Sequence, residues 1–237
     1  ELIWENSAEK AFEDKYTAAL STSIHFYDHL AHSYIQGVCD DLSMKFAGSF
    51  SADMYDLLKE SERSRLHMFA DNFFQVIEEK IPIQRSYPQI SVKHFDYQLI
   101  ENIHEISLNK NKVVVLTDSQ PAQNNLINMI KRFKLSFDDK VELINLHDID
   151  IKGGCLGCLQ CAYNNTCVYS GKDQFIDFYK KKLMPADILI FAGAVRDRYL
   201  SSRWKLFFFF FWFNSHKPSF LGKQLGFIIS WPFSQIP

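Results

Sequence analysis

Four of the five cysteines fall in one short stretch of the chain, with the spacing Cys-x2-Cys-x2-Cys-x5-Cys. They are Cys155, Cys158, Cys161 and Cys167. Four thiolates so close in sequence can converge on one soft metal centre, and the glycines of the same stretch permit tight turns. Coordination by four cysteines suits either an iron–sulfur cluster or structural zinc. The stretch therefore predicts a metal or redox site.

The order of the spacings bears on these alternatives. Zinc sites usually pair two Cys-x2-Cys knuckles across a longer insert, whereas three cysteines at x2 intervals are typical of iron–sulfur ligation. Unligated or disulfide-forming thiols are a third interpretation. The fifth cysteine, Cys39, stands alone in a predicted helix and is interpreted as a small buried apolar residue. Because a secreted disulfide scaffold would spread its cysteines, the clustering favours a reducing compartment and a cytoplasmic location.

Strands and helices alternate through residues 112–237. Apolar runs predict buried strands at Lys112–Thr117, Val141–Leu146, Asp187–Ala192 and Gly222–Ser230. Apolar residues at helical spacing predict helices at Asn125–Phe133 and Asp173–Leu183. Strands separated by single helices imply right-handed crossovers. We therefore expect an α/β fold, a doubly wound parallel sheet with helices on both faces.

Predicted strands and helices also alternate in the first 90 residues. They predict two strands and two helices, at Tyr16–Ser23, Asp28–Asp40, Met44–Ser49 and Glu60–Lys80. The last of these helices is amphipathic, and its predicted apolar face consists of Leu66, Phe69, Phe73, Phe74 and Ile77. Residues 91–111 are predicted to form a linker.

The run CLGCLQCAYNNTCVYSGKDQF, followed by ADILIFAGAV and a helix start at Trp204–Lys205, resembles the iron–sulfur flavoproteins and related NAD(P)H-dependent FMN reductases. The resemblance implies a flavodoxin-like fold and FMN as cofactor. It also implies a 4Fe–4S cluster on the four clustered cysteines, and NAD(P)H as a possible electron donor.

The two parts of the chain resemble different stages of that fold. Residues 1–90 resemble the tail of an upstream flavodoxin-like copy, from its fourth strand to its fifth helix. Residues 112–237 resemble an FMN-binding copy that stops after its fourth strand. An unrelated helical N-terminal domain is the alternative for residues 1–90. If the tail supplies the missing edge strand and helix, both parts form one permuted sheet and the edge is covered.

Three loops at the carboxyl ends of the predicted strands are expected to contact FMN, because ligands of open parallel sheets bind there. The first loop offers Thr117, Ser119, Gln120, Gln123, Asn124 and Asn125. The second offers Ala194, Val195, Arg196, Arg198, Tyr199 and Ser201. The third, at residues 230–234, offers Ser230 and Trp231.

Each loop is expected to contact a different part of the cofactor. Hydroxyls, amides and a helix N-terminus suit the phosphate at the first loop, although Asp118 carries a charge of the wrong sign. In the second loop, an arginine could stabilise anionic flavin or phosphate, and Tyr199 could stack on the ring. Trp231 in the third loop either stacks on the ring or blocks it.

An aromatic run departs from the family pattern, since Phe207–Phe213 contains only aromatic side chains. Seven successive aromatic residues cannot all face inward on a helix, so some must be exposed or buried against a partner. Sequence corruption, deliberate alteration and a dimer-facing patch are the interpretations. From the family and from this run we expect a homo-oligomer.

Composition excludes several classes of function. The net charge of −2 gives no basic field for nucleic acid or an anionic membrane. The longest apolar run, Leu206–Phe213, is far shorter than the ~20 residues that span a bilayer. With the resemblance, the sequence predicts an FMN-dependent oxidoreductase or electron-transfer flavoprotein, served by a redox partner protein or a nicotinamide donor. A flavin-free structural module or a zinc-stabilised interaction module is the rival.

Overall fold

The computed structural model describes residues 2–22, 28–53, 55–89, 95–100, 106–137, 141–164, 166–196, 198–210, 213 and 219–231, with the backbone alone at Arg196 and Phe210. The chain forms two compact units, which consist mainly of residues 1–92 (unit 1) and residues 93–231 (unit 2). In the described ranges, no helix combines the length and the apolarity that a membrane crossing requires.

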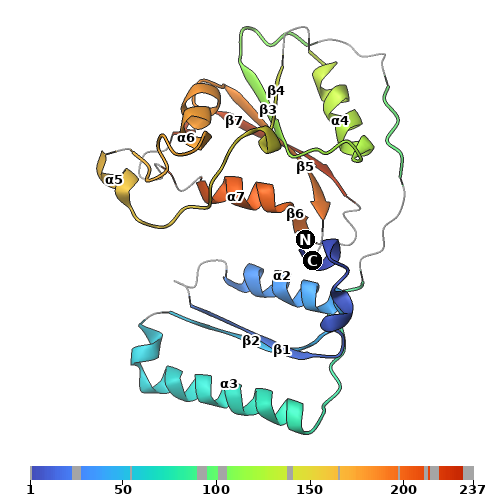
Figure 1. The fold of residues 1–237 in the computed structure, drawn as a ribbon, viewed down its shortest axis with the longest axis vertical. Helices are drawn as coiled ribbons and strands as arrows, with labels where there is room; N and C mark the ends of the chain where they lie inside the picture. The colour runs from blue at the N-terminus through green and yellow to red at the C-terminus, as the bar shows by residue number, and fades with distance from the viewer. Residues whose placement is uncertain are drawn as a thin grey trace. The chain divides into compact units, whose positions relative to one another are not determined.

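Unit 2 is built around a mainly parallel sheet (Figure 1). Its strands are β3 (Val113–Thr117), β4 (Glu142–Asn145), β5 (Ile188–Arg196), β6 (Tyr199–Leu200) and β7 (Gln224–Ser230). Its helices are α4 (Asn124–Lys134), α5 (Gln160–Asn164), α6 (Phe175–Phe178), the π-helical turn η4 (Tyr179–Leu183) and α7 (Ser202–Phe210).

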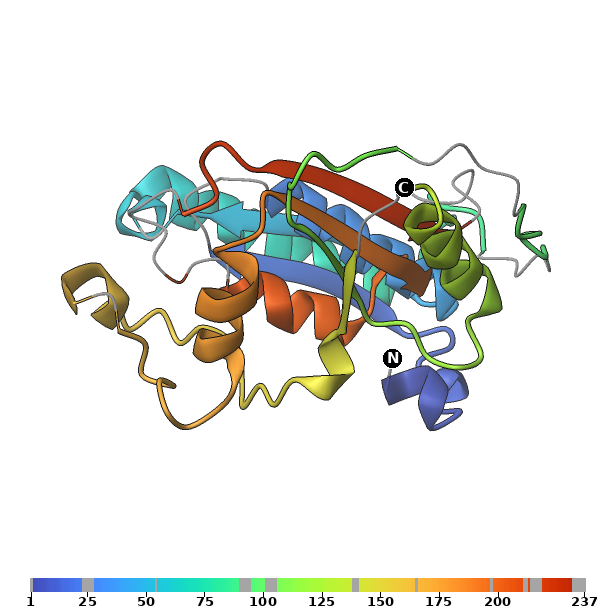
Figure 2. The same cartoon turned by 90° about the horizontal axis from the view of Figure 1, so that it is seen from above.

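The parallel strands of unit 2 lie in the order β4-β3-β5-β7, and β6 adds antiparallel to β5. Figure 2 shows β5 and β7 side by side. Chain order therefore reads second, first, third and fourth strand across the sheet, which is compatible with a flavodoxin-like doubly wound sheet. The predicted α/β class, with parallel strands flanked by helices, is confirmed.

The central strand β3 is buried on both faces, as its continuous run of β-branched and apolar residues predicts. Val114 and Leu116 belong to a core that includes residues of α6 and α7. Val113 and Val115 belong to a second core with residues of α4. In Figure 1, α4 accordingly lies on one side of the sheet and α6 and α7 lie on the other.

Unit 1 contains a two-stranded parallel sheet between two helices (Figure 1). Its elements are the short helices α1 (Leu2–Glu5), η1 (Glu9–Ala11) and η2 (Asp56–Leu58), then β1 (Tyr16–Thr22), α2 (Asp28–Asp41), β2 (Lys45–Ala52) and α3 (Glu60–Glu78). The predicted order of strand, helix, strand and helix is confirmed. In each case the structure moves the boundary by only a few residues.

The core of unit 1 is small, and its main cluster consists of Ala19, Cys39 and Phe46. The burial predicted for Cys39 is confirmed, since the residue is 6% exposed. No residue of α3 is buried, although the ring of Phe69 lies 5.8 Å from that of Phe50 in β2. The prediction that Phe74 shares the inward face is wrong, because it is 59% exposed. Successive helical residues such as Phe73 and Phe74 point in directions about 100° apart.

Candidate functional site

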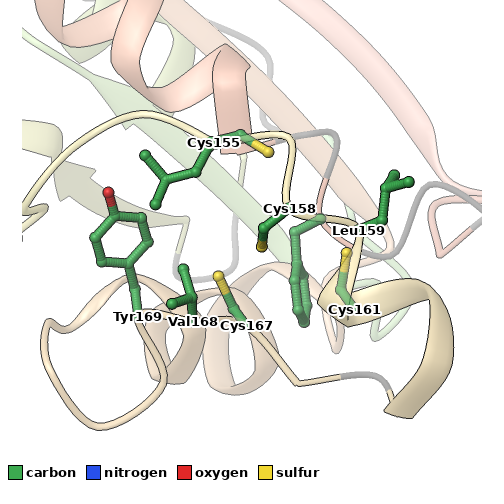
Figure 3. A pocket seen from close by; sticks show the side chains of 9 residues that line it. Cys155, Cys158, Leu159, Cys161, Cys167, Val168 and Tyr169 are labelled. Atoms are coloured by element: carbon green, nitrogen blue, oxygen red, sulfur yellow. The ribbon is translucent and has the colours of Figure 1, made fainter.

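The four clustered cysteines line one pocket of unit 2 (Figure 3). They lie between β4 and α6, and α5 carries Cys161. All four are free thiols, with Cys155 and Cys158 exposed and Cys161 and Cys167 half-buried. Both overall views show α5 projecting away from the sheet (Figures 1 and 2). The fold thus brings together every cysteine that the sequence placed in the site.

The walls of the cysteine pocket are mainly apolar. The other residues that line it are Leu156, Leu159, Val168, Tyr169 and Phe213. Phe213 is 5% exposed and, among the described lining residues, is the one that comes from outside residues 155–169. Low polarity around sulfur ligands excludes water and tunes the potential of a redox centre. Sequence reasoning did not assign Phe213 to the site, because nothing local connects it to the cysteines.

Backbone geometry turns the cysteine loop tightly around its sulfur atoms. Gly157 and Leu159 both have positive φ, of 65° and 56°. This conformation suits glycine and is uncommon for leucine. The backbone N–H of Gly157 donates to Sγ of Cys155 at 3.5 Å. The backbone N–H of Cys167 donates to Ser170 Oγ at 3.1 Å. The loop already directs a backbone donor at one candidate ligand.

The surroundings of Cys167 in the pocket disfavour its thiolate form. Burial raises the pKa of the Cys167 thiol, and the neighbouring Cys158, Cys161 and Cys155 raise it further. A hydrogen bond from the backbone of Tyr169 acts in the opposite direction. A cationic metal centre would remove this penalty, because coordination favours the thiolate.

The donor set fits a soft metal, although the loop does not hold it in ligating geometry. Four thiols in one apolar hollow match the ligands of iron–sulfur clusters and of structural zinc. Among the described residues, no three His, Cys, Asp or Glu side chains are arranged to coordinate one ion.

The aromatic run is divided between the core and the cysteine pocket. Trp204 and Phe207 are 0% exposed, and Phe207 packs edge-on against Phe175 of α6 at 6.1 Å. Phe209 is 44% exposed. Its ring lies 3.5 Å from the position that a Cβ on Gly154 would occupy. Residues 211 and 212 lie outside the described ranges. At Gly154, an added Cβ would be in ordinary van der Waals contact with this ring.

The first predicted flavin loop, after β3, is closed by its own hydrogen bonds. The N–H of Ser119 donates to Thr117 Oγ1 at 3.0 Å, and the N–H of Gln120 donates to Gln123 Oε1 at 2.8 Å. The N–H of Gln123 donates to the carbonyl of Gln120 at 2.9 Å. Asn124 begins α4. Three backbone donors that could face an anion are therefore already used.

Asn125 is hydrogen-bonded to residues 95–97, a segment that was predicted to belong to the linker. Its Oδ1 accepts from the N–H of Tyr97 at 2.7 Å, and its Nδ2 donates to the carbonyl of Phe95. Asn128 Nδ2 also donates to the carbonyl of Tyr97, at 3.2 Å. These bonds fasten residues 95–97 along α4. The side chain of Asn125 is thus committed to holding this segment.

The second predicted loop is joined to the first by a buried hydrogen bond. Ser201 Oγ donates to Asp118 Oδ2 at 2.5 Å. Asp118 and Arg198 are each 3% exposed, whereas Tyr199 is 44% exposed. Lys205 Nζ lies 5.7 Å from the centre of the Tyr199 ring. The structure describes only the backbone of Arg196. Asp118, which accepts the hydrogen bond of Ser201, was not among the residues predicted to contact FMN.

Strand register brings the three predicted loops to one end of the sheet. Thr117 is paired with Ala192 of β5, and Ala194 is paired with Ser230 of β7. Val195 follows Ala194 and pairs with β6. Nε1 of Trp231 is buried and has no hydrogen-bond partner among the described residues. The rest of the third loop, residues 232–234, lies outside the described ranges.

Comparisons of the chain with protein-family models, with curated proteins and with solved structures found no match. Function must therefore be inferred from the side chains themselves. Among the described residues, we consider two candidate sites: the cysteine pocket and the carboxyl end of the unit 2 sheet.

Proposed function

We propose that this protein is an electron-transfer flavoprotein or flavin-dependent oxidoreductase whose cysteine pocket holds an iron–sulfur cluster. The observation that carries the proposal is that four free thiols, spaced as in iron–sulfur ligation, line one apolar pocket. Zinc would suit the same donors, but the compact x2-x2-x5 spacing favours the cluster. A 4Fe–4S cluster would supply one-electron transfer at this pocket.

The residues of the chain would hold and tune the cluster. The four pocket cysteines would be its ligands, and the N–H of Gly157 would hydrogen-bond to the sulfur of Cys155. Such hydrogen bonds, together with the apolar Leu156, Leu159 and Phe213, set the reduction potential.

The flavin belongs, in this proposal, to the carboxyl end of the unit 2 sheet. Support comes from the three predicted loops, which strand register brings to that end. Tyr199, with 44% of its surface exposed, offers a ring for stacking. In the first loop the N–H groups of Ser119, Gln120 and Gln123 are already hydrogen-bonded within the loop, whereas the N-terminus of α4 has no side-chain cap and offers its first-turn N–H groups to the phosphate of FMN. The electron donor would be a nicotinamide or a redox partner protein.

The test is a visible spectrum of the anaerobically purified protein, with iron, sulfide and flavin quantified in the same sample. We expect flavin bands above a broad iron–sulfur shoulder, with about four irons per chain. Cys158→Ser should lose most of the iron, because it removes a ligand from the centre of the motif. Cys39→Ser, which changes a thiol in unit 1, is the matched control and should retain it.

Three other results would contradict the proposal in different ways. Zinc without iron would assign the pocket to a structural metal. Flavin without metal would leave a flavoprotein whose cysteines are unligated. A colourless protein without metal would favour the flavin-free structural module.

A further inference from the structure

The cysteine pocket has an inner side that faces the core and an outer side that faces solvent. On the inner side, Cys161 and Cys167 pack against the main core cluster of unit 2, to which the buried Phe213 also belongs. On the outer side, Cys155 and Cys158 are exposed. Because the core closes the inner side, a partner that exchanges electrons with a centre held by these cysteines approaches from the outer side.

Large apolar side chains accompany the cysteines on the outer side. Leu156 and Leu159 line the pocket and are 65% and 59% exposed. Tyr163, which belongs to α5, is 87% exposed. We call these three residues the cysteine rim. A single exposed apolar residue is ordinary, but a group of them beside a candidate redox site indicates an interaction surface, and tyrosine is enriched in such surfaces.

The stretch that carries the cysteine rim has no charged residue. From residue 153 to residue 171 the sequence contains no Asp, Glu, Lys or Arg. The flanking charges balance, since Asp150 pairs with Lys152 at 2.9 Å and Lys172 is followed by Asp173. A surface without charge gives no electrostatic steering to a charged partner. The surface that complements the cysteine rim is therefore itself uncharged and apolar.

Shape and size favour a protein as the partner, and a transient complex. Small molecules bind in concave sites that enclose most of their surface, whereas α5 projects away from the sheet in both overall views (Figures 1 and 2). A stable complex buries roughly 800 Å² of each partner, which three side chains do not provide. Weak electron-transfer complexes lie at the small end of the range of interface sizes.

We propose that the cysteine rim is the docking surface for a redox protein whose own contact surface is uncharged and apolar. The inference rests on the proposed iron–sulfur function and names the kind of partner that this site takes. In the complex, one electron passes from the reduced cluster to the oxidised metal centre of the partner. The cluster is oxidised, the partner's metal is reduced, and no bond forms or breaks.

The experiment measures electron transfer in a stopped-flow spectrometer from the full chain, purified anaerobically and reduced with dithionite. The protein acceptor is azurin, a blue-copper protein chosen for its apolar, uncharged contact surface, and ferricyanide is the small acceptor that needs no docking surface. We expect the rate constant for azurin to change by less than about twofold between about 0.05 and 0.5 M salt, because no charge steers the encounter.

Tyr163→Ser is the test variant, because Tyr163 is exposed and lies outside the pocket lining. It should lower the rate constant for azurin at least about fivefold, since a central aromatic contact is lost. Iron content and the rate with ferricyanide should stay the same. Tyr55→Ser is the matched control, because it makes the same change at a 64% exposed tyrosine of unit 1, and it should alter none of these quantities.

Docking is also measured without electron transfer. Azurin loaded with zinc in place of copper is redox-inactive, and its amide NMR shifts report on complex formation with the full chain. We expect shifts confined to the apolar contact surface of azurin, with binding weakened at least about fivefold by Tyr163→Ser and unchanged by Tyr55→Ser. This readout does not depend on the reduction potential of the cluster.

The outcomes separate this inference from the proposed function. If the protein contains iron and reduces ferricyanide, but Tyr163→Ser leaves both the azurin rate and the azurin shifts unchanged, the docking role of the cysteine rim is overturned and the iron–sulfur function remains. A dimer that Tyr163→Ser abolishes in ultracentrifugation then assigns the rim to a second copy, and loss of binding to phosphatidylcholine vesicles assigns it to a lipid surface. A protein without iron overturns both proposals.

Discussion

Unit 1 and unit 2 use the same parallel strand–helix pattern but achieve very different burial. In unit 2, β3 is buried on both faces, and one core cluster alone extends from Val114 to Phe213. In unit 1, the main cluster contains Ala19, Cys39 and Phe46, and α3 buries no residue. An isolated two-stranded sheet is only marginally stable, so unit 1 depends on the helices that pack against its sheet. Secondary-structure pattern alone therefore does not determine how well a unit is packed.

Unit 1 compensates in part with polar contacts. The buried carboxylate of Asp40 accepts the N–H groups of Ser86 and Tyr87 at 3.0 and 2.9 Å. Arg85 donates to Ser43 Oγ at 2.6 Å, in the turn after α2. These bonds tie the segment after α3 to the region of α2. Unit 1 is therefore held by a few specific anchors, whereas unit 2 is held by its core.

The largest expected effect is the difference in unfolding free energy between two Phe→Ala substitutions, one made in each unit. Phe207→Ala removes a fully buried ring in unit 2 and should cost about 3–5 kcal/mol of unfolding free energy. Phe74→Ala removes a ring that is 59% exposed in unit 1 and should cost less than about 1 kcal/mol. Urea unfolding followed by circular dichroism measures both. Equal costs would refute the contrast in packing.

The next effect concerns the anchor in unit 1. Asp40→Ala leaves the N–H groups of Ser86 and Tyr87 without their acceptor and should cost about 1–3 kcal/mol. Hydrogen exchange should then show faster exchange of these two amides, while the amides of β3 keep their protection. Unchanged exchange at Ser86 and Tyr87 would mean that the anchor contributes nothing.

The rate of thiol alkylation should differ between Cys39 of unit 1 and Cys155 of unit 2. Burial, and then the charge of Asp40, raises the pKa of the Cys39 thiol, although a hydrogen bond with Thr17 partly opposes this. At about pH 8 in metal-free protein, Cys39 should be alkylated at least about tenfold more slowly than the exposed Cys155. Peptide mass spectrometry after iodoacetamide treatment measures the rates.

The sign of the pH effect follows from the raised pKa. The unfolded chain loses the Cys39 proton at a lower pH than the folded chain, so stability falls as pH rises through the ordinary thiol range. Cys39→Ala should therefore reduce the loss of stability at alkaline pH. Equal alkylation rates for Cys39 and Cys155 would contradict the burial of Cys39.

The smallest effect should be that of an exposed ion pair. Lys181 and Asp177 lie one helical turn apart, at 2.7 Å, and both side chains are largely exposed. Lys181→Ala should change the unfolding free energy by less than about 0.5 kcal/mol. A larger loss in urea unfolding would show that the surface of unit 2 contributes more than its core packing suggests.

Local pattern predicted most of the elements but not their burial. The apolar run of β3 and the helical spacing of α4 were sufficient to predict both, because strand and helix periodicity are local properties. The antiparallel β6 was not predicted, since two residues carry no periodicity. Phe74 was assigned to the wrong face, because apolar type alone does not separate neighbours on a helix.

Local sequence patterns are enough to predict the order of strands and helices, the four-cysteine spacing and the polar loops after the strands. The tertiary structure sets which distant residues meet. It brought Phe213 to the cysteine pocket, joined Ser201 to Asp118 and fastened Tyr97 to Asn125. The physical reason is that backbone periodicity depends on neighbouring residues, whereas these contacts depend on how the crossovers return the chain to one end of the sheet.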